Sequence, residues 1–150
     1  MPLRTARYAI AGALALAGCA TPAVIDSHAT VPVRIFNIAS RFEQDRRQGG
    51  MTAVTTDIEQ CYAAATLPVV KIFELRDCLV LDYVGYQTDV TIGRRHFGVA
   101  MPYFEDRTAF ARWTKYGPPA QFDNPNRLVA YLSNGNGMVQ LDLARIAAAH

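Results

Sequence analysis

Residues 56–93, TDIEQCYAAATLPVVKIFELRDCLVLDYVGYQTDVTIG, decide the fold because they contain two helical patterns separated by a proline. In both patterns, 56–65 and 74–92, apolar residues recur three or four positions apart, which is the spacing of one helix face. Pro68 ends the first pattern, and residues 69–73 suit either an extended connector or the start of the second helix. The stretch therefore predicts a helical hairpin.

Further helical patterns lie on both sides of this hairpin. They cover 32–48, which Gly49-Gly50 should stop; 106–116, with Phe110 and Trp113 facing inward; a short helix from Pro125 to Tyr131, capped by Asn124; and 138–149. Asn134-Gly135-Asn136-Gly137 is predicted as a turn. Since few segments alternate with period two, we expect an all-α fold, a small bundle of about five helices.

The N-terminus has the layout of a secretory signal. Arg4 and Arg7 precede a run of nine apolar residues, 9–17, and the run Leu16-Ala17-Gly18 ends at Cys19. A membrane-spanning helix needs about 20 apolar residues, so this run is too short for one. An ordinary secretory signal cut elsewhere, or an uncleaved helix, is the alternative to a signal that ends before Cys19.

Residues 1–19 resemble the precursor of a bacterial lipoprotein, whose lipobox ends in a cysteine. The resemblance implies that Cys19 receives a diacylglyceryl group, that the chain is cut before Cys19, and that the new terminus is acylated, for example with palmitate. Ala20 occupies the position where an aspartate would retain such a protein in the inner membrane. The expected location is thus the outer membrane, on its periplasmic face. Residues 1–18 would be the signal peptide, 19–30 the lipidated terminus and tether, and 31–150 the helical domain.

Cys61 and Cys78 are the two cysteines left when Cys19 is set aside, and export would place them where disulfides form and persist. We expect them to be bonded to each other; two unpaired buried thiols are the alternative. A bridge needs Cα atoms within about 7 Å, so in antiparallel helices both cysteines lie about equally far from the turn. The second helix should therefore begin near Glu74 and leave 67–73 as a non-helical link.

The charge balance argues against nucleic acid as a partner. The chain has 15 lysines and arginines and 13 acidic residues; loss of residues 1–18 would remove Arg4 and Arg7 and no acidic residue, which leaves 13 of each. A neutral chain lacks the basic footprint typical of nucleic-acid-binding proteins. The expected partners are the membrane, through the lipid, and a protein of the envelope.

No catalytic or metal-binding set is apparent in the sequence. His28, His96 and His150 lie far apart, and no HExxH, CxxC or GxSxG motif occurs. We therefore expect no metal, no cofactor and no catalytic residue, and predict that the protein is not an enzyme. Residues distant in sequence can still meet in a fold, so an envelope hydrolase with His96 as general base is an open alternative.

Aromatic residues and arginines are frequent between residues 94 and 127, and both types are enriched in protein interfaces. The candidate binding residues are Arg94, Arg95, Tyr103, Arg107, Trp113 and Tyr116. The alternative, which we favour for most of the rings, is that they form the core and the arginines lie across them. Together these features predict a non-catalytic accessory or scaffold lipoprotein that binds another envelope protein. A periplasmic inhibitor of a cell-wall-degrading enzyme is the second possibility.

Overall fold

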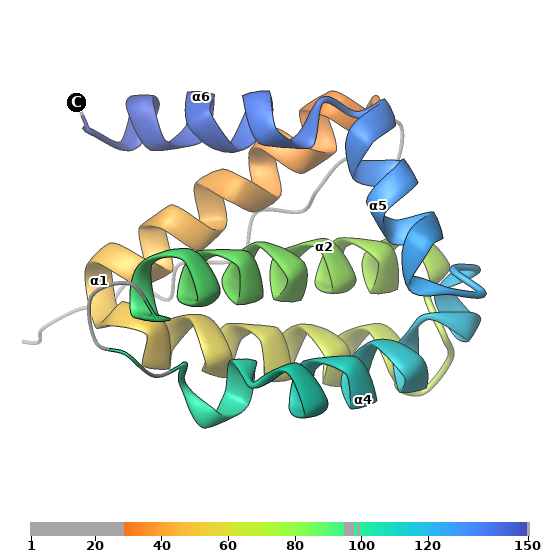
Figure 1. Ribbon diagram of the computed structural model, residues 1–150. Coiled ribbons are helices and arrows are strands. Elements are labelled where there is room, and N and C mark those ends of the chain that lie inside the picture. Colours follow the sequence, from red (N-terminus) through yellow and green to blue (C-terminus); the bar gives the residue numbers. More distant parts are fainter. Residues whose placement is uncertain (1–28, 95–97, 99, 150) are drawn as a thin grey trace, which may run out of the picture.

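The structure, a computed structural model, describes residues 29–94, 98 and 100–149. In these ranges the fold is all-α, as predicted, with five α-helices and no strand (Figure 1). The elements in chain order are α1 (Val31–Thr66), α2 (Ile72–Thr88), the π-helical turn η1 (Asp89–Gly93), the 3-10 helix η2 (Pro102–Phe104), α4 (Asp106–Tyr116), the 3-10 helix η3 (Pro118–Ala120), α5 (Pro125–Asn134) and α6 (Gly137–Ala149). None of the helices in these ranges has the combination of length and apolar character that crossing a membrane requires.

α1 is bent at Gly50, where φ is 67° and ψ is −162°. Glycine adopts a positive φ without the steric cost that other residues bear. Two separate helices were expected in this region, 32–48 and 56–65, and Gly50, whose dihedral angles are not helical, does separate two helical segments. The predicted stop at Gly49-Gly50 is therefore confirmed, but the second segment begins at once, at Met51, so that the two segments meet in a bend without a connecting loop. The first half of α1 turns away from the second at this bend (Figure 1).

The second half of α1 and α2 form the predicted hairpin (Figure 1). Residues 67–71 make a non-helical link that is closed by a hydrogen bond from Lys71 N to Ala65 O at 2.9 Å. The Cys61–Cys78 disulfide joins the two helices, and the Cα atoms lie 5.6 Å apart. The predicted bridge and link are both confirmed, although α2 begins at Ile72, two residues earlier than expected.

The core lies between this hairpin and the helices that cover it. α6 packs along the first half of α1 and α4 packs against α2, so the two lie on opposite sides of the hairpin (Figure 1). Phe42, Ile58, Leu79 and Phe104 are among the largest fully buried side chains. These residues come from α1, α2 and η2, so segments far apart in sequence share one core.

Two buried charge clusters join elements that are distant in sequence. Arg34 in the first turn of α1 donates to both carboxylate oxygens of Asp77 in α2, at 3.2 and 2.6 Å. Glu43 in α1 accepts hydrogen bonds from Arg46 at 2.7 Å and from Arg145 of α6 at 3.3 Å. A buried carboxylate without a partner is strongly unfavourable, so these pairs fix α2 and α6 against α1.

α5 and α6 form the C-terminal part of the domain. Asn124 caps α5 as predicted: its side-chain oxygen accepts from Arg127 N at 3.3 Å. α5 continues to Asn134, and α6 begins at Gly137. The predicted turn 134–137 is therefore shorter than expected.

The disulfide should contribute strongly to stability. Replacing both cysteines, Cys61→Ser with Cys78→Ser, should lower the free energy of unfolding by about 3 kcal/mol, because the bridge closes a 17-residue loop in the unfolded chain. Denaturant unfolding of the oxidised wild type, the reduced wild type and the double variant measures this difference. The reduced wild type and the double variant should have the same free energy of unfolding. A double variant as stable as the oxidised wild type would contradict the stabilising role of the disulfide.

Candidate binding surface around α4

One buried carboxylate, Asp82 of α2, attaches α4 to the hairpin. Its side chain is fully buried and accepts hydrogen bonds from Nε and Nη2 of Arg112 in α4, at 2.9 and 2.6 Å. It also accepts from the hydroxyl of Tyr62 in α1 at 3.0 Å. Asp82 therefore joins three helices, and because its burial requires these donors, it fixes the position of Arg112.

Arg112 in turn positions Tyr103. Its Nη1 donates to the Tyr103 carbonyl oxygen at 2.7 Å, and its guanidinium carbon lies 3.8 Å from the centroid of the Tyr103 ring. On the same side of α4, Tyr116 stacks on Tyr62 with centroids 4.0 Å apart. We call Tyr62, Tyr103, Arg112 and Tyr116 the Tyr103 flank of α4. These contacts hold the arginine and the rings in place.

The protonation states suit this flank to binding. Burial raises the pKa of Tyr62 well above its usual value, and the charge of Asp82 raises it further. Burial also raises the pKa of Tyr103. Burial disfavours the charged form of Arg112, but the hydrogen bonds and charge of Asp82 outweigh this and raise its pKa. At neutral pH Tyr62 and Tyr103 are thus neutral phenols and Arg112 is a charged guanidinium.

The other side of α4 is a cluster of four rings, Tyr83, Tyr86, Phe110 and Trp113, which we call the Phe110 flank. Trp113 lies at its centre, with its ring centroid 5.7 Å from Tyr83, 5.1 Å from Tyr86 and 5.4 Å from Phe110. Such tilted and edge-on contacts between rings stabilise a packed cluster. On α4, Phe110 and Arg112 are two residues apart and so point about 160° away from each other around the helix.

The structure brings some of the predicted binding residues together and separates others. Tyr103 and Tyr116 are half-buried and belong to the same flank. Arg94 is exposed and forms an ion pair with Asp106 at 2.8 Å, and Arg107 is exposed on the outer side of α4. Arg95 lies outside the described residues, as does His96.

Trp113 faces inward, as the helical pattern predicted, and at 8% exposure it is wrong as one of the candidate binding residues. Phe110 was expected to face inward together with Trp113, but it is 49% exposed. The inward face of α4 is formed by Ala109 and Trp113, which are four residues apart. Phe110 follows Ala109 directly and so points about 100° away from it around the helix.

Sequence reasoning did not identify Asp82 or Tyr62 as part of the site. The available signal was a single acidic residue within the apolar run 78–84, CLVLDYV. A charge in such a run faces the core and needs a partner. The sequence does not show which arginine pairs with the carboxylate of Asp82.

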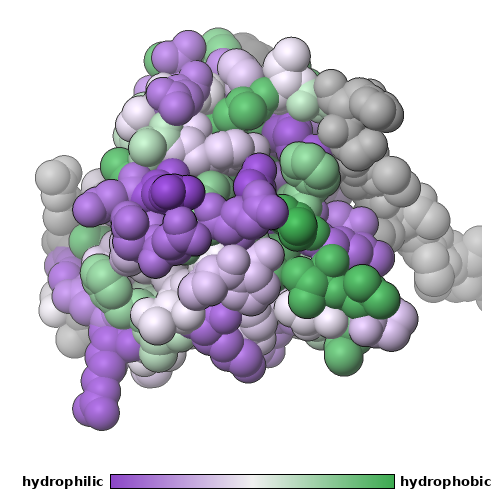
Figure 2. All heavy atoms as spheres, turned by 90° about the vertical axis from the view of Figure 1, so that its right-hand side faces the viewer, coloured by the Kyte–Doolittle hydropathy of each residue, from purple (hydrophilic) through white to green (hydrophobic). Residues whose placement is uncertain are grey.

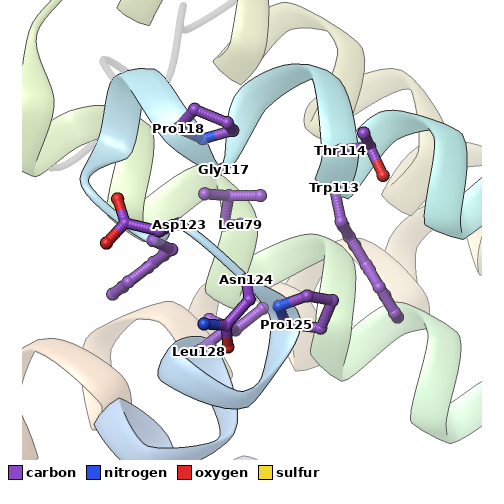
Figure 3. A pocket seen from close by; sticks show the side chains of 10 residues that line it. Leu79, Trp113, Thr114, Gly117, Pro118, Asp123, Asn124, Pro125 and Leu128 are labelled. Atoms are coloured by element: carbon purple, nitrogen blue, oxygen red, sulfur yellow. The ribbon is translucent and has the colours of Figure 1, made fainter.

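A small cavity of about 90 Å³ lies where α4 meets α5 (Figure 3). Trp113 and Thr114 line it from α4, and Leu128 lines it from α5. The indole Nε1 of Trp113 is buried and has no hydrogen-bond partner in the part of the chain that the structure describes. Since each water takes about 30 Å³, the cavity suits a few ordered waters better than an organic ligand.

A larger pocket of about 540 Å³ lies beside the bend of α1. The bend, the π-helical turn η1 and residues 100–102 line it. The Thr88 hydroxyl is buried with no partner among the described residues, and Asp89 Oδ2 accepts from Met101 N at 2.9 Å. No group of three or more His, Cys, Asp or Glu side chains placed to hold a metal occurs in the described ranges. Polar and charged residues, among them Arg46, Thr88 and Asp89, line this pocket together with apolar ones.

Two carboxyl groups meet across the bend of α1. Asp57 forms an ion pair with Arg41, and the Oδ2 atoms of Asp45 and Asp57 are both buried without a donor in the described part of the chain. Burial, together with a hydrogen bond to Asp57 and its charge, raises the pKa of Asp45 to about 6. In the folded state Asp45 therefore holds a proton, shared with Asp57, only below about pH 6, and it is charged at neutral pH.

Comparison with known proteins gives no match: no family model, no curated protein and no solved structure matches this chain. Its own residues and their geometry thus carry the argument for its function.

The Asp82 ion pair should be essential to the fold. Asp82→Ala leaves Arg112 without its buried partner and should lower the free energy of unfolding by about 3–5 kcal/mol. Asp106→Ala is the matched control, because Asp106 also pairs with an arginine but its side chain is 59% exposed, so the change in stability should be small. Denaturant unfolding compares the two variants. Equal losses of stability would contradict the role of Asp82.

The carboxyl pair should make stability depend on pH. Because the pKa of Asp45 rises from 3.8 in the unfolded chain to about 6 in the fold, the folded state binds the proton more tightly. Stability from this group is present below pH 4 and is lost between pH 4 and about 6. Asp45→Asn should therefore stabilise the protein at pH 7 by about 1 kcal/mol, after allowance for its partial exposure, and have little effect at pH 4.

Unfolding midpoints of wild type and Asp45→Asn at pH 4 and pH 7 test this. Asp123→Asn, at an exposed aspartate that pairs with Arg127, is the control and should show no such gain at pH 7. An Asp45→Asn variant that is destabilised at pH 7 would contradict the raised pKa of Asp45.

Proposed function

We propose that the protein is a non-catalytic lipoprotein of the bacterial envelope that binds another envelope protein. Lipid on Cys19 would attach the chain to the outer membrane on its periplasmic face. The lipobox and the alanine at position 20 support this anchor. Two or more acyl chains hold a protein stably at a bilayer, whereas one chain binds only marginally. The folded domain would then work as a binding module next to the membrane.

The observation that carries the binding proposal is the fixed placement of Tyr103 and Tyr116. Tyr103 is held by its contact with Arg112, and Tyr116 by its stacking on Tyr62. Side chains that are already ordered lose little conformational entropy when a partner binds. Tyrosine and arginine also dominate the energetics of many protein interfaces. The Tyr103 flank is thus a preorganised surface of the right composition.

The charges around this flank indicate what the partner presents. The Lys115 amine lies 4.8 Å from the centre of the Tyr116 ring, and Lys115 is exposed. A partner surface with carboxylates would complement this cation.

Crosslinking in the envelope tests the proposal. A photo-crosslinking amino acid at position 108 of the full chain, which is exposed and lies one turn before Arg112 on the same side of α4, should give one discrete protein adduct, identified by mass spectrometry. Adding Tyr103→Ala should reduce this adduct by roughly tenfold or more, because truncating an interface anchor removes much of the binding energy.

Phe110→Ala is the matched control. It removes an exposed ring of the same helix, but from the opposite flank, and should leave the adduct unchanged. The proposal fails if no discrete adduct forms, if Tyr103→Ala has no effect, or if the loss follows Phe110 instead.

A further inference from the structure

We infer that the link between α1 and α2 contacts the lipid surface of the membrane to which the protein is anchored; this rests on the proposed anchor at Cys19. The link and the first turn of α2 expose several large apolar side chains. Leu67 is 70% exposed, Val69 is 71% exposed and Phe73 is 56% exposed. Exposed apolar side chains that gather on a protein surface commonly mark a site of contact with another molecule or with a membrane.

The composition of residues 67–73, LPVVKIF, fits lipid. The segment contains a single charged residue, Lys71, whose amine lies 3.2 Å from Glu74 at the surface. A lysine next to an apolar segment can extend its amine to the head-group level while the apolar residues enter the acyl boundary. Protein interfaces favour tyrosine and arginine, as on the Tyr103 flank, and the link has neither.

The link lies next to the point where the tether enters the domain. The carbonyl oxygen of Thr30, the residue before α1, accepts from Arg34 N at 3.0 Å. The Arg34 side chain donates to the carbonyl oxygen of Phe73 at 3.1 Å, and its guanidinium lies 5.6 Å from the centre of the Phe73 ring. The first turn of α1 therefore contacts the first turn of α2. The link directly precedes this turn of α2.

The tether limits how far this end can move from the bilayer. From Cys19 to Thr30 the chain makes eleven residue steps, which span at most about 40 Å when fully extended. The end of the domain that carries the link is therefore also the end that the anchor holds near the membrane. In Figure 1 the link lies at the right of the molecule, and Figure 2 shows this end from outside, with apolar residues gathered at one side of a largely hydrophilic face.

α6 carries a second group of exposed apolar side chains, among them Val139, Leu143 and Ile146. Asp142 and Arg145 interrupt it, and the helix runs away from the tether towards the opposite end of the molecule (Figure 1). The link is therefore the better candidate for contact with lipid. Ile146, near the far end of α6, provides a matched reference position because it is 58% exposed.

This orientation leaves the Tyr103 flank accessible, because the flank is set back from the link. Tyr62 lies five residues before Leu67, a rise of about 8 Å at 1.5 Å per residue, and Asp82 lies ten residues after Ile72, a rise of about 15 Å. An apolar tip at the head-group boundary would therefore hold the binding surface above the lipid. Lipid contact and partner binding would use different parts of the domain.

Fluorescence quenching tests the inference on the mature, lipidated protein reconstituted in phosphatidylethanolamine–phosphatidylglycerol vesicles. Two variants, Val69→Trp and Ile146→Trp, place a reporter on the link or on α6, and the buried Trp113 is the same background in both. Brominated acyl chains should quench the tryptophan at position 69 severalfold more than the one at position 146.

The outcomes separate this inference from the proposed anchor, because the mass of the reconstituted protein shows whether Cys19 carries acyl chains. Equal quenching at both positions in a lipidated protein, or stronger quenching at position 146, overturns the lipid contact and leaves the anchor intact. A concentration-dependent emission shift at position 69 without vesicles would show that a second copy covers the link, which also overturns it. A mature protein without lipid on Cys19 overturns the proposed anchor and the inference with it.

Discussion

The buried carboxylate of Asp82 is the interaction on which the arrangement of the domain depends. It accepts hydrogen bonds from Tyr62 of α1 and from Arg112 of α4 while it lies in α2. A buried ion pair adds little net stability compared with a well-packed apolar core, but the loss of one partner is very unfavourable. The pair therefore selects one placement of α4 over others that would bury the same apolar area. Because Arg112 also holds Tyr103, the interaction that orders the helix orders the surface as well.

Three other constraints keep the hairpin and its covering helices in place. The Cys61–Cys78 disulfide fixes the register of α1 and α2, and the Arg34–Asp77 pair fixes the end of the hairpin where the chain enters. Glu43 holds α6 through Arg145. A domain of this size buries a limited core, so covalent and charged contacts between elements contribute specificity that apolar packing alone would not provide.

The sequence predicted the helices and the hairpin because two kinds of information agreed. Helical periodicity located the segments, and the requirement that Cys61 and Cys78 approach closely placed the link between them. The interruption at Gly49-Gly50 was predicted, but the restart of the helix directly after it was not, because a glycine pair both ends helices and allows a sharp turn, and the sequence does not distinguish the two. Phe110 was wrongly predicted to face inward because the prediction favoured the large ring, whereas the small residue Ala109 occupies the inward position.

The candidate site was only partly predictable for a physical reason. Tyr103 and Tyr116 were identified from residue type alone, but their grouping depends on Asp82, which lies 21 residues before Tyr103 in the sequence. A single acidic residue in an apolar run indicates a buried carboxylate, which needs a hydrogen-bonding or cationic partner. Several arginines were available, and only the packing of α4 against α2 determines that Arg112 is the partner.

The most direct test of this account is the exchange rate of the Arg112 Nε proton with solvent, measured by ¹⁵N–¹H NMR on the whole protein. If Asp82 holds Arg112 in the core, this proton should exchange far more slowly than that of Arg107, which is exposed on the same helix. Equal exchange rates for the two arginines would contradict the account, because α4 would then not be fixed to the hairpin through Asp82.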